Sequence, residues 1–146
     1  MEGLSLITDG ELYAVDVTAV QKVVRNMPYT RTPAAQDAIA GIANLKGGVI
    51  TLLCLSVLLG RERNDRAANA IIFKPPERRN NQMGLLVDCL GDLIHISDAA
   101  IREQRAAREG EDHALITGYA EIDGKLCRII STEAITGRWN EKDEEI

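Results

Sequence analysis

Residues 41–53 read Gly-Ile-Ala-Asn-Leu-Lys-Gly-Gly-Val-Ile-Thr-Leu-Leu, so that two short apolar stretches flank an Asn-Leu-Lys-Gly-Gly sequence. Glycine and asparagine adopt positive φ more readily than other residues, and we therefore expect Asn44, Gly47 and Gly48 to form a sharp turn between two strands. Such a turn holds Lys46 in solvent at the tip of a hairpin. A charged side chain on a rigid hairpin suits contact with another macromolecule at least as well as catalysis.

Short strand-like stretches of this kind recur along the chain, and two further hairpins are predicted around Asp9-Gly10 and Asp123-Gly124. We also expect a turn at Gly91-Asp92, and an acceptor role for Asp88 at a strand end. The predicted strands cover residues 4–8, 11–15, 21–25, 39–45, 49–55, 70–73, 83–88, 93–96, 114–122 and 125–131. Helical turns are expected at 18–20, 57–60 and 101–108, and a helix-like tail at 132–139. About ten short strands with few helices favour β-barrels or a sandwich over an α/β enzyme.

Composition narrows the class of partner. The 146 residues fit one domain, or two small subdomains that share a core. A formal charge of -5 disfavours a nucleic-acid backbone or an anionic membrane as the main partner. An aromatic content of 3% weakens a nucleic-acid role further, because single-strand binders stack bases on aromatic side chains.

The three cysteines, Cys54, Cys89 and Cys127, lie in apolar stretches without a Cys-x-x-Cys pair. This odd count indicates reduced, mostly buried thiols and no zinc site. The first residues lack the basic segment and long apolar core of a signal peptide, and no apolar run is long enough to span a bilayer. We expect a cytoplasmic protein.

Residues suited to catalysis are few. His95 and His113 have no fixed spacing to a nucleophile, and a structural role is favoured for both. Glu111, Asp112 and His113 are adjacent in one loop and do not converge on a metal ion without ligands from elsewhere. No phosphate-binding loop occurs, since residues 46–48 lack the helix start and the Ser or Thr that such a loop requires. The sequence therefore predicts no enzyme, no cofactor and no metal.

The 41–53 segment closely resembles the signature hairpin of the CheW family of bacterial chemotaxis coupling proteins. That family typically shows Gly-x-x-Asn-Leu-Arg-Gly before a strand, matched here by Gly41, Asn44, Leu45 and Gly47, with Lys46 at the arginine position. Residues 13–17 and 20–23 resemble the family's Tyr-x-Ile-x-Ile and Val-x-Glu-Val region, and residues 32–33 its proline-containing lead. Residues 84–88 are similar to its Gly-x-x-Val-Asp strand, and residues 116–130 fall where a terminal hairpin is expected. The resemblance covers nearly the whole chain.

The resemblance implies an all-β fold with two SH3-like, five-stranded barrels around a shared hydrophobic core. We expect a single domain over residues 1–146, with approximate sub-barrels 1–65 and 66–146. The implied function is non-enzymatic: an adaptor that couples the cytoplasmic tip of a methyl-accepting chemoreceptor to the regulatory domain of a CheA-like histidine kinase. Neither nucleic acid nor direct membrane insertion is implied, although such a protein is recruited to membrane-bound receptor arrays.

Family positions also suggest which residues contact partners: Val20, Lys22, Val23, Gly41, Asn44, Lys46, Gly47 and Val87. The valines are equally compatible with an ordinary core, because apolar periodicity does not separate a groove from an interior. The two glycines are also explained by backbone requirements, and the asparagine by turn geometry. Lys46 is the strongest contact candidate, since solvent or a partner is what holds a lysine at a hairpin tip.

Several residues depart from the family pattern. Lys46 keeps the charge of the usual arginine but loses its planar five-donor fork. Residues 50–56 replace the proline, aspartate and arginine of the usual Val-x-Pro-x-x-Asp-Leu-Arg. Lys22 stands where an acidic residue is usual, which reverses a charge on an expected partner face. These changes indicate a divergent paralogue with its own receptor and kinase.

Three alternatives remain open from the sequence, and the third is an enzyme, which would need a pocket with perturbed ionisable groups around His95 or Asp88. The first is the same fold in pilus-based motility or in a second-messenger pathway. The second is a small β-barrel that binds nucleic acid through Arg61, Arg63, Arg66, Lys74, Arg78 and Arg79. Acidic residues interrupt that basic set, so a solvated surface is the simpler interpretation.

Overall fold

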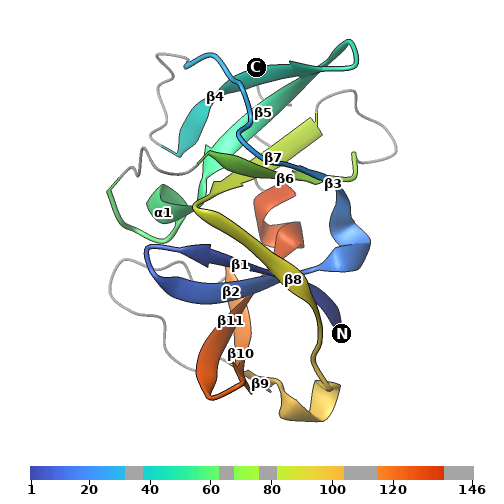
Figure 1. Cartoon of the computed structure of the whole chain (residues 1–146), viewed down its shortest axis with the longest axis vertical. Coiled ribbons are helices and arrows are strands. Elements are labelled where there is room, and N and C mark those ends of the chain that lie inside the picture. The colour runs from blue at the N-terminus through green and yellow to red at the C-terminus, as the bar shows by residue number, and fades with distance from the viewer. Residues whose placement is uncertain (32–37, 63–67, 76–81, 104–114, 137–146) are drawn as a thin grey trace.

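The computed structural model describes residues 1–31, 38–62, 68–75, 82–103 and 115–136. Within these ranges the strands form two sheets that lie one above the other in Figure 1. Sheet A, in the lower half of the view, has the strand order β8-β1-β2-β11-β10-β9, and sheet B, in the upper half, has the order β3-β6-β7-β5-β4.

The strands of sheet A are β1 (Glu2–Thr8), β2 (Glu11–Asp16), β8 (Cys89–His95), β9 (Arg102–Glu103), β10 (Ile116–Ile122) and β11 (Lys125–Ile130). Those of sheet B are β3 (Val20–Val24), β4 (Ile39–Leu45), β5 (Gly48–Cys54), β6 (Asn69–Phe73) and β7 (Gln82–Val87). Short helices are η1 (Val17–Ala19), α1 (Leu55–Leu58) and η2 (Asp98–Ala100), and residues 132–136 are also helical.

Tight two-residue turns close the predicted hairpins. Asp9 and Gly10 join β1 to β2 with φ of 52° and 78°, and Asp123 and Gly124 join β10 to β11 with φ of 49° and 78°. Positive φ at both central residues is the signature of the type I′ turn, whose twist matches that of antiparallel strands. The chain turns from sheet A to sheet B through η1, where the Asp16 side chain accepts a hydrogen bond from the backbone N–H of Thr18 (2.9 Å).

The buried hydrophobic side chains form three clusters. A shared core between the sheets contains Tyr13 of β2, Phe73 of β6, Leu85 of β7 and Ile135 of the C-terminal helical segment. A second cluster consists of buried side chains that belong to the sheet B subdomain. A third cluster, which includes Cys127, belongs to the sheet A subdomain. This arrangement confirms the prediction of two small β subdomains around one shared core, although sheet A also carries the two-residue strand β9.

The predicted division at residue 65 does not follow the sheets. The strands of sheet A come from residues 2–16, 89–103 and 116–130, whereas the strands of sheet B come from residues 20–24, 39–54, 69–73 and 82–87. The reason is a parallel pairing between the N-terminal strand β2 and the C-terminal strand β11, in which Leu12 lies opposite Cys127. A pairing over such a separation leaves no local signal in the sequence.

Two local predictions were wrong. Gly91 and Asp92 form a bulge within β8 rather than a turn, because Leu4 pairs with Leu93 while Leu6 pairs with Leu90. Ser5 stabilises this bulge, since its hydroxyl accepts from the backbone N–H of Asp92 (2.9 Å) and lies 3.1 Å from the Asp92 carbonyl. The prediction of a helix at 101–108 was also wrong for residues 102–103, which form strand β9. Residues 104–108 lie outside the described ranges.

Candidate partner-binding site

The β4–β5 hairpin places Lys46 at its tip, as the sequence predicts. The turn residues are Lys46 and Gly47, with φ of 50° and 79°, and Leu45 pairs with Gly48 across the hairpin. Asn44 lies within β4, whose bounds match the predicted strand 39–45, and Gly48 begins β5, so neither residue is one of the two central residues of the turn. A type I′ turn needs only its two central residues at positive φ.

The backbone of Lys46 is unfavourable for a lysine. Its φ of 50° lies in the left-handed region, where the Cβ atom crowds the backbone and an L-residue other than Gly, Asn or Asp costs about 1–2 kcal/mol. The other two type I′ turns of the described part carry aspartate at the same position. An outlier of this kind motivates a functional hypothesis for the side chain.

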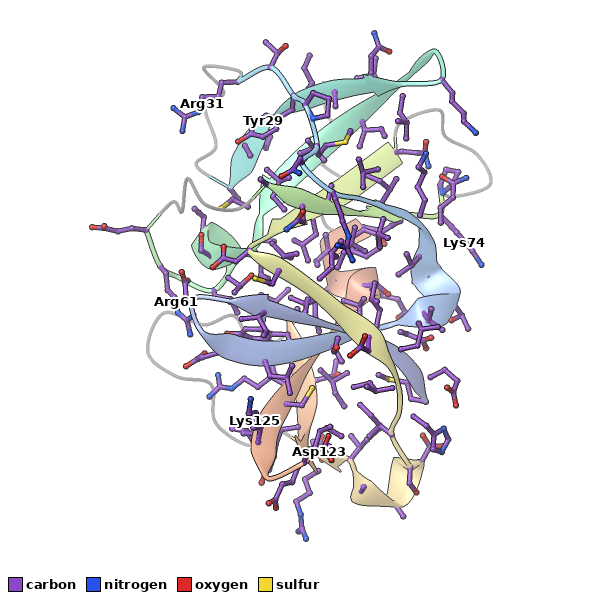
Figure 2. All side chains as sticks on the ribbon, in the orientation of Figure 1. Tyr29, Arg31, Arg61, Lys74, Asp123 and Lys125 are labelled. Atoms are coloured by element: carbon purple, nitrogen blue, oxygen red, sulfur yellow. The ribbon has the colours of Figure 1, made fainter. Side chains whose placement is uncertain are left out.

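An apolar groove runs beside this hairpin. It has a volume of about 420 Å³, and its walls include Tyr29, Ile42, Asn44 and Val49. Ile42 and Val49 are 42% and 49% exposed, which is high for aliphatic side chains. Asn44 pairs directly with Val49 across the hairpin and is exposed, so it belongs to this surface. Figure 2 shows Tyr29 and Arg31 at the end of the molecule formed by sheet B.

Gly41 allows the segment that forms one wall of the groove to pack closely on β4. A Cβ atom at this position would lie 2.3 Å from the carbonyl oxygen of Thr30, so only glycine allows the segment before β4 to pack on the strand. Thr30 and Ile42 exchange two backbone hydrogen bonds of 2.8 and 2.9 Å there. Gly41 is buried, and its role in the site is to bring the Tyr29 segment to the groove.

Strand β3 carries a separate set of predicted site residues. Val23 is 44% exposed, whereas Val20 and Lys22 are half-buried. Val20 packs against the shared core between the sheets. In the strand order of sheet B, β3 and β4 are the two terminal strands, so Lys22 and Val23 lie on a different strand from the one that leads to Lys46. The segment after β3 returns to β4 through the bridge between Thr30 and Ile42.

Val87 lies at the end of β7 and is fully buried in the shared core. Its side chain is therefore available for packing between the two sheets rather than for a surface contact. The sequence also missed Tyr29, Ile42 and Val49 as groove residues. Strand alternation was the available signal, since Ile42 and Val49 face away from the side of the hairpin that buries Ala43 and Ile50.

Arg61, which was considered for nucleic-acid binding, is engaged with the β1–β2 hairpin. Its guanidinium donates to Oε2 of Glu11 (2.6 Å) and to Oδ2 of Asp9 (3.3 Å). The Tyr13 hydroxyl donates to the same Glu11 oxygen (2.8 Å), and the backbone N–H of Asp9 donates to Asp88 (2.9 Å). Asp88 thus has the acceptor role that was expected of it.

This network shifts the pKa values of its members. Burial, followed by the hydrogen bond to Glu11, raises the pKa of the Tyr13 phenol. Desolvation lowers the pKa of Arg61, but the bond to Glu11 and the neighbouring charges outweigh it and the net shift is upward. Arg61 and Lys74 lie on opposite sides of the molecule in Figure 2, so they do not form one basic surface. The other four basic residues of that set, Arg63, Arg66, Arg78 and Arg79, lie outside the described ranges.

Other reactive side chains are dispersed. In the part of the chain that the structure describes, no three His, Cys, Asp or Glu side chains gather as metal ligands, and no helix is both long and apolar enough to cross a membrane. Glu111, Asp112 and His113 fall outside that part. Cys54 and Cys127 are buried and Cys89 is exposed, and burial raises the pKa of the Cys127 thiol to about 11.

Comparison with known proteins assigns the family. The sequence profile described as a CheW-like domain matches residues 2–138. The chain belongs to the CheW family. A probable chemotaxis protein CheW of Rhizobium etli is 26% identical over 123 residues, which cover 84% of this chain and 79% of that protein. The chemotaxis protein CheW of Thermotoga maritima is 25% identical over 144 residues, covering 92% and 93%.

A solved structure agrees with the assignment. The scaffolding protein TtCheW from Thermoanaerobacter tengcongensis superimposes with a TM-score of 0.77 at 26% identity, covering 89% of this chain and 88% of that one. The predictions of a divergent CheW-like chain with two SH3-like subdomains are therefore confirmed. CheW proteins are non-enzymatic scaffolds of chemotaxis, and this chain is one of them.

Proposed function

We propose that this CheW-family scaffold couples a methyl-accepting chemoreceptor to a CheA-like histidine kinase. The observation that supports this role best is the β4–β5 hairpin surface, where a lysine in an unfavourable backbone conformation stands beside an exposed apolar groove. The adaptor then works in the cytoplasm and is recruited to membrane-bound receptor arrays.

An adaptor needs two separate surfaces on one rigid body, and sheet B offers both. The hairpin surface combines an apolar groove, which takes an apolar side chain of the partner, with Lys46, which pairs with a carboxylate at the rim. The β3 surface combines exposed Val23 with half-buried Lys22 on the other terminal strand of the same sheet. We assign the kinase to the hairpin surface and the receptor tip to the β3 surface.

The site residues divide accordingly. Lys46, Asn44 and the turn residue Gly47 belong to the hairpin contact, and Gly41 supports it through the backbone. Lys22 and Val23 belong to the β3 contact, with Val20 supporting them from the shared core. Val87 is left out, because its side chain is fully buried.

The two lysines adapt the scaffold to its own partners. Lys46 presents a compact ammonium where a bidentate guanidinium is usual, which favours a single carboxylate at the kinase contact. Lys22 reverses the usual acidic charge, which favours an acidic group on the receptor face.

Titration against the regulatory domain of a CheA-like kinase, and separately against a receptor tip from the same organism, tests the proposal. We expect saturable binding to each, a loss of kinase affinity for Lys46→Ala, and a loss of receptor affinity for Lys22→Glu. Lys125→Ala is the matched control, because Lys125 is an exposed lysine on sheet A. No binding to any CheA-like kinase of that organism would exclude the proposed coupling.

A further inference from the structure

Lys46 carries a primary amine at the exposed tip of the β4–β5 hairpin. The next residue, Gly47, has no side chain to cover this amine, and a Cβ atom built on Gly47 would meet no described heavy atom within 4 Å beyond its chain neighbours. Within the described ranges no carboxylate forms an ion pair with Lys46. The amine is therefore accessible and is not held by a neighbouring acid.

The other described lysines differ from Lys46 in backbone position. Lys22 is half-buried within β3, Lys74 follows β6 and Lys125 begins β11. Among these lysines, Lys46 is the one whose φ is positive, at 50°. It also stands beside the apolar groove, on the surface that we assign to the kinase. A change in the charge of Lys46 therefore acts on that contact.

Lysine is an unfavourable residue for the first central position of this turn. Asparagine, aspartate or glycine adopts positive φ at lower cost, and the arginine of the CheW motif would keep the charge with more hydrogen-bond donors. Lysine differs from all of these in its nucleophilic amine. A neutral lysine amine forms an amide with an activated acyl group, whereas the guanidinium of arginine stays protonated in proteins. Lys46 thus supplies the contact with a positive charge that a modification removes.

We propose that Lys46 is an acylation site and that its acylation weakens the kinase contact. The donor is an activated acyl group, carried as an acyl phosphate or as an acyl thioester. The neutral Nζ attacks the carbonyl carbon of the donor, and an N–C bond forms. The bond from that carbon to the phosphate oxygen or to the sulfur breaks, and its electron pair leaves with the phosphate or the thiolate. One proton passes from the nitrogen to solvent, nothing is oxidised or reduced, and the product is a neutral amide.

The neutral amide changes the charge at the rim of the groove and leaves the groove itself intact. It no longer pairs with a carboxylate of the kinase, whereas Ile42 and Val49 stay exposed for the apolar part of the contact. Acylation should therefore weaken kinase binding without abolishing it, and a bound kinase should protect the amine. The effect on the kinase rests on the proposed function, but the reactivity of Lys46 in the free protein does not.

Two acyl donors and two arginine variants test the inference. The full chain is treated with acetyl phosphate or with acetyl-coenzyme A, and mass spectrometry gives the rate of acetylation at each lysine. We expect Lys46 to be acetylated, and the donor that gives the higher rate identifies the donor class. The kinase regulatory domain should slow this reaction at Lys46 and leave the rate at Lys125 unchanged.

Isothermal titration with the kinase regulatory domain then measures the effect on binding. Acetylation of the unmutated chain should lower the affinity about fivefold, as expected for the loss of one charged contact. Lys46→Arg keeps the charge without an acylatable amine, so its affinity should stay within about twofold of the unmutated chain before and after treatment. Lys125→Arg is the matched control, since it removes an exposed amine on sheet A and should still lose affinity when treated.

Three results would overturn the inference. These are an unmodified Lys46 with both donors while Lys125 is acetylated, unchanged kinase affinity of a chain acetylated at Lys46, and an equal loss of affinity in treated Lys46→Arg. Failure of the proposed function has a different signature, because the untreated chain then does not bind the kinase, and the mass spectra alone decide whether Lys46 is an acylation site. Circular dichroism of every protein is measured first, so that affinities are compared only among folded chains.

Discussion

Replacing Lys46 with asparagine distinguishes the effect of the turn conformation on stability from the effect of the lysine side chain on binding. Lys46 has a φ of 50° at the first central position of a type I′ turn, a position that asparagine prefers. The left-handed conformation costs a lysine about 1–2 kcal/mol, and asparagine avoids much of this cost through local hydrogen bonds. We therefore expect Lys46→Asn to raise the free energy of unfolding by about 0.5–1 kcal/mol, which corresponds to an increase of about 1–4 °C in Tm.

The same substitution removes the ammonium group that we assign to the kinase contact. Loss of a charged contact worth about 1 kcal/mol lowers affinity about fivefold. Urea unfolding followed by circular dichroism gives the stability, and isothermal titration with the kinase regulatory domain gives the affinity. The account thus predicts a variant that is more stable and binds more weakly, which simple damage to the fold does not produce.

Lys125→Asn is the control, because Lys125 is an exposed lysine on strand β11 rather than in a turn. It should lower stability slightly, since asparagine is a poor strand residue, and leave kinase binding intact. A destabilised Lys46→Asn protein would refute the reasoning about the turn. A stabilised protein with unchanged kinase affinity would remove Lys46 from the interface.

Four further predictions concern other parts of the fold. Gly41→Ala should destabilise by about 1–3 kcal/mol in urea unfolding, because the new Cβ would lie 2.3 Å from a carbonyl oxygen; a neutral effect would contradict the close approach. Arg61→Ala should cost about 1–2 kcal/mol, allowing for partial solvent exposure, and should speed amide exchange in the β1–β2 turn, whereas unaltered exchange would argue against this contact. Cys89 should be the one thiol that reacts rapidly with Ellman's reagent in the native protein, and rapid reaction of a second thiol would disprove the burial of the others. Hydrogen bonds from Thr18 lower the pKa of Asp16, so its stabilising effect should be complete above about pH 4 and disappear as pH falls through the depressed pKa; an Asp16→Ala defect that persisted in acid would be inconsistent with this assignment.

Local features of the fold could be predicted because their signals are local. Asp-Gly and Lys-Gly pairs between apolar stretches give the three type I′ hairpins, and the helical turn expected at residues 18–20 overlaps η1. The resemblance of residues 41–47 to the CheW family motif then predicts the architecture of the whole chain. Each of these inferences depends on residues close together in the sequence.

The rest depends on contacts between distant residues. The pairing of β2 with β11 determines which strands share sheet A, and no local sequence pattern predicts this pairing. Val87 has the same apolar character as Val23, yet one is fully buried between the sheets and the other is exposed at a sheet edge. Gly91-Asp92 has the composition of a turn, but the hydroxyl of Ser5 holds it within a strand as a bulge.

The most direct test of the central claim is a hydrogen-exchange footprint of the kinase regulatory domain on this protein. The account predicts that binding slows exchange at residues 28–30 and 42–49, where the groove and the hairpin tip lie, and leaves strands β10 and β11 unchanged. A footprint that avoids the β4–β5 hairpin, with clear protection elsewhere, would contradict the assignment of the kinase to this surface.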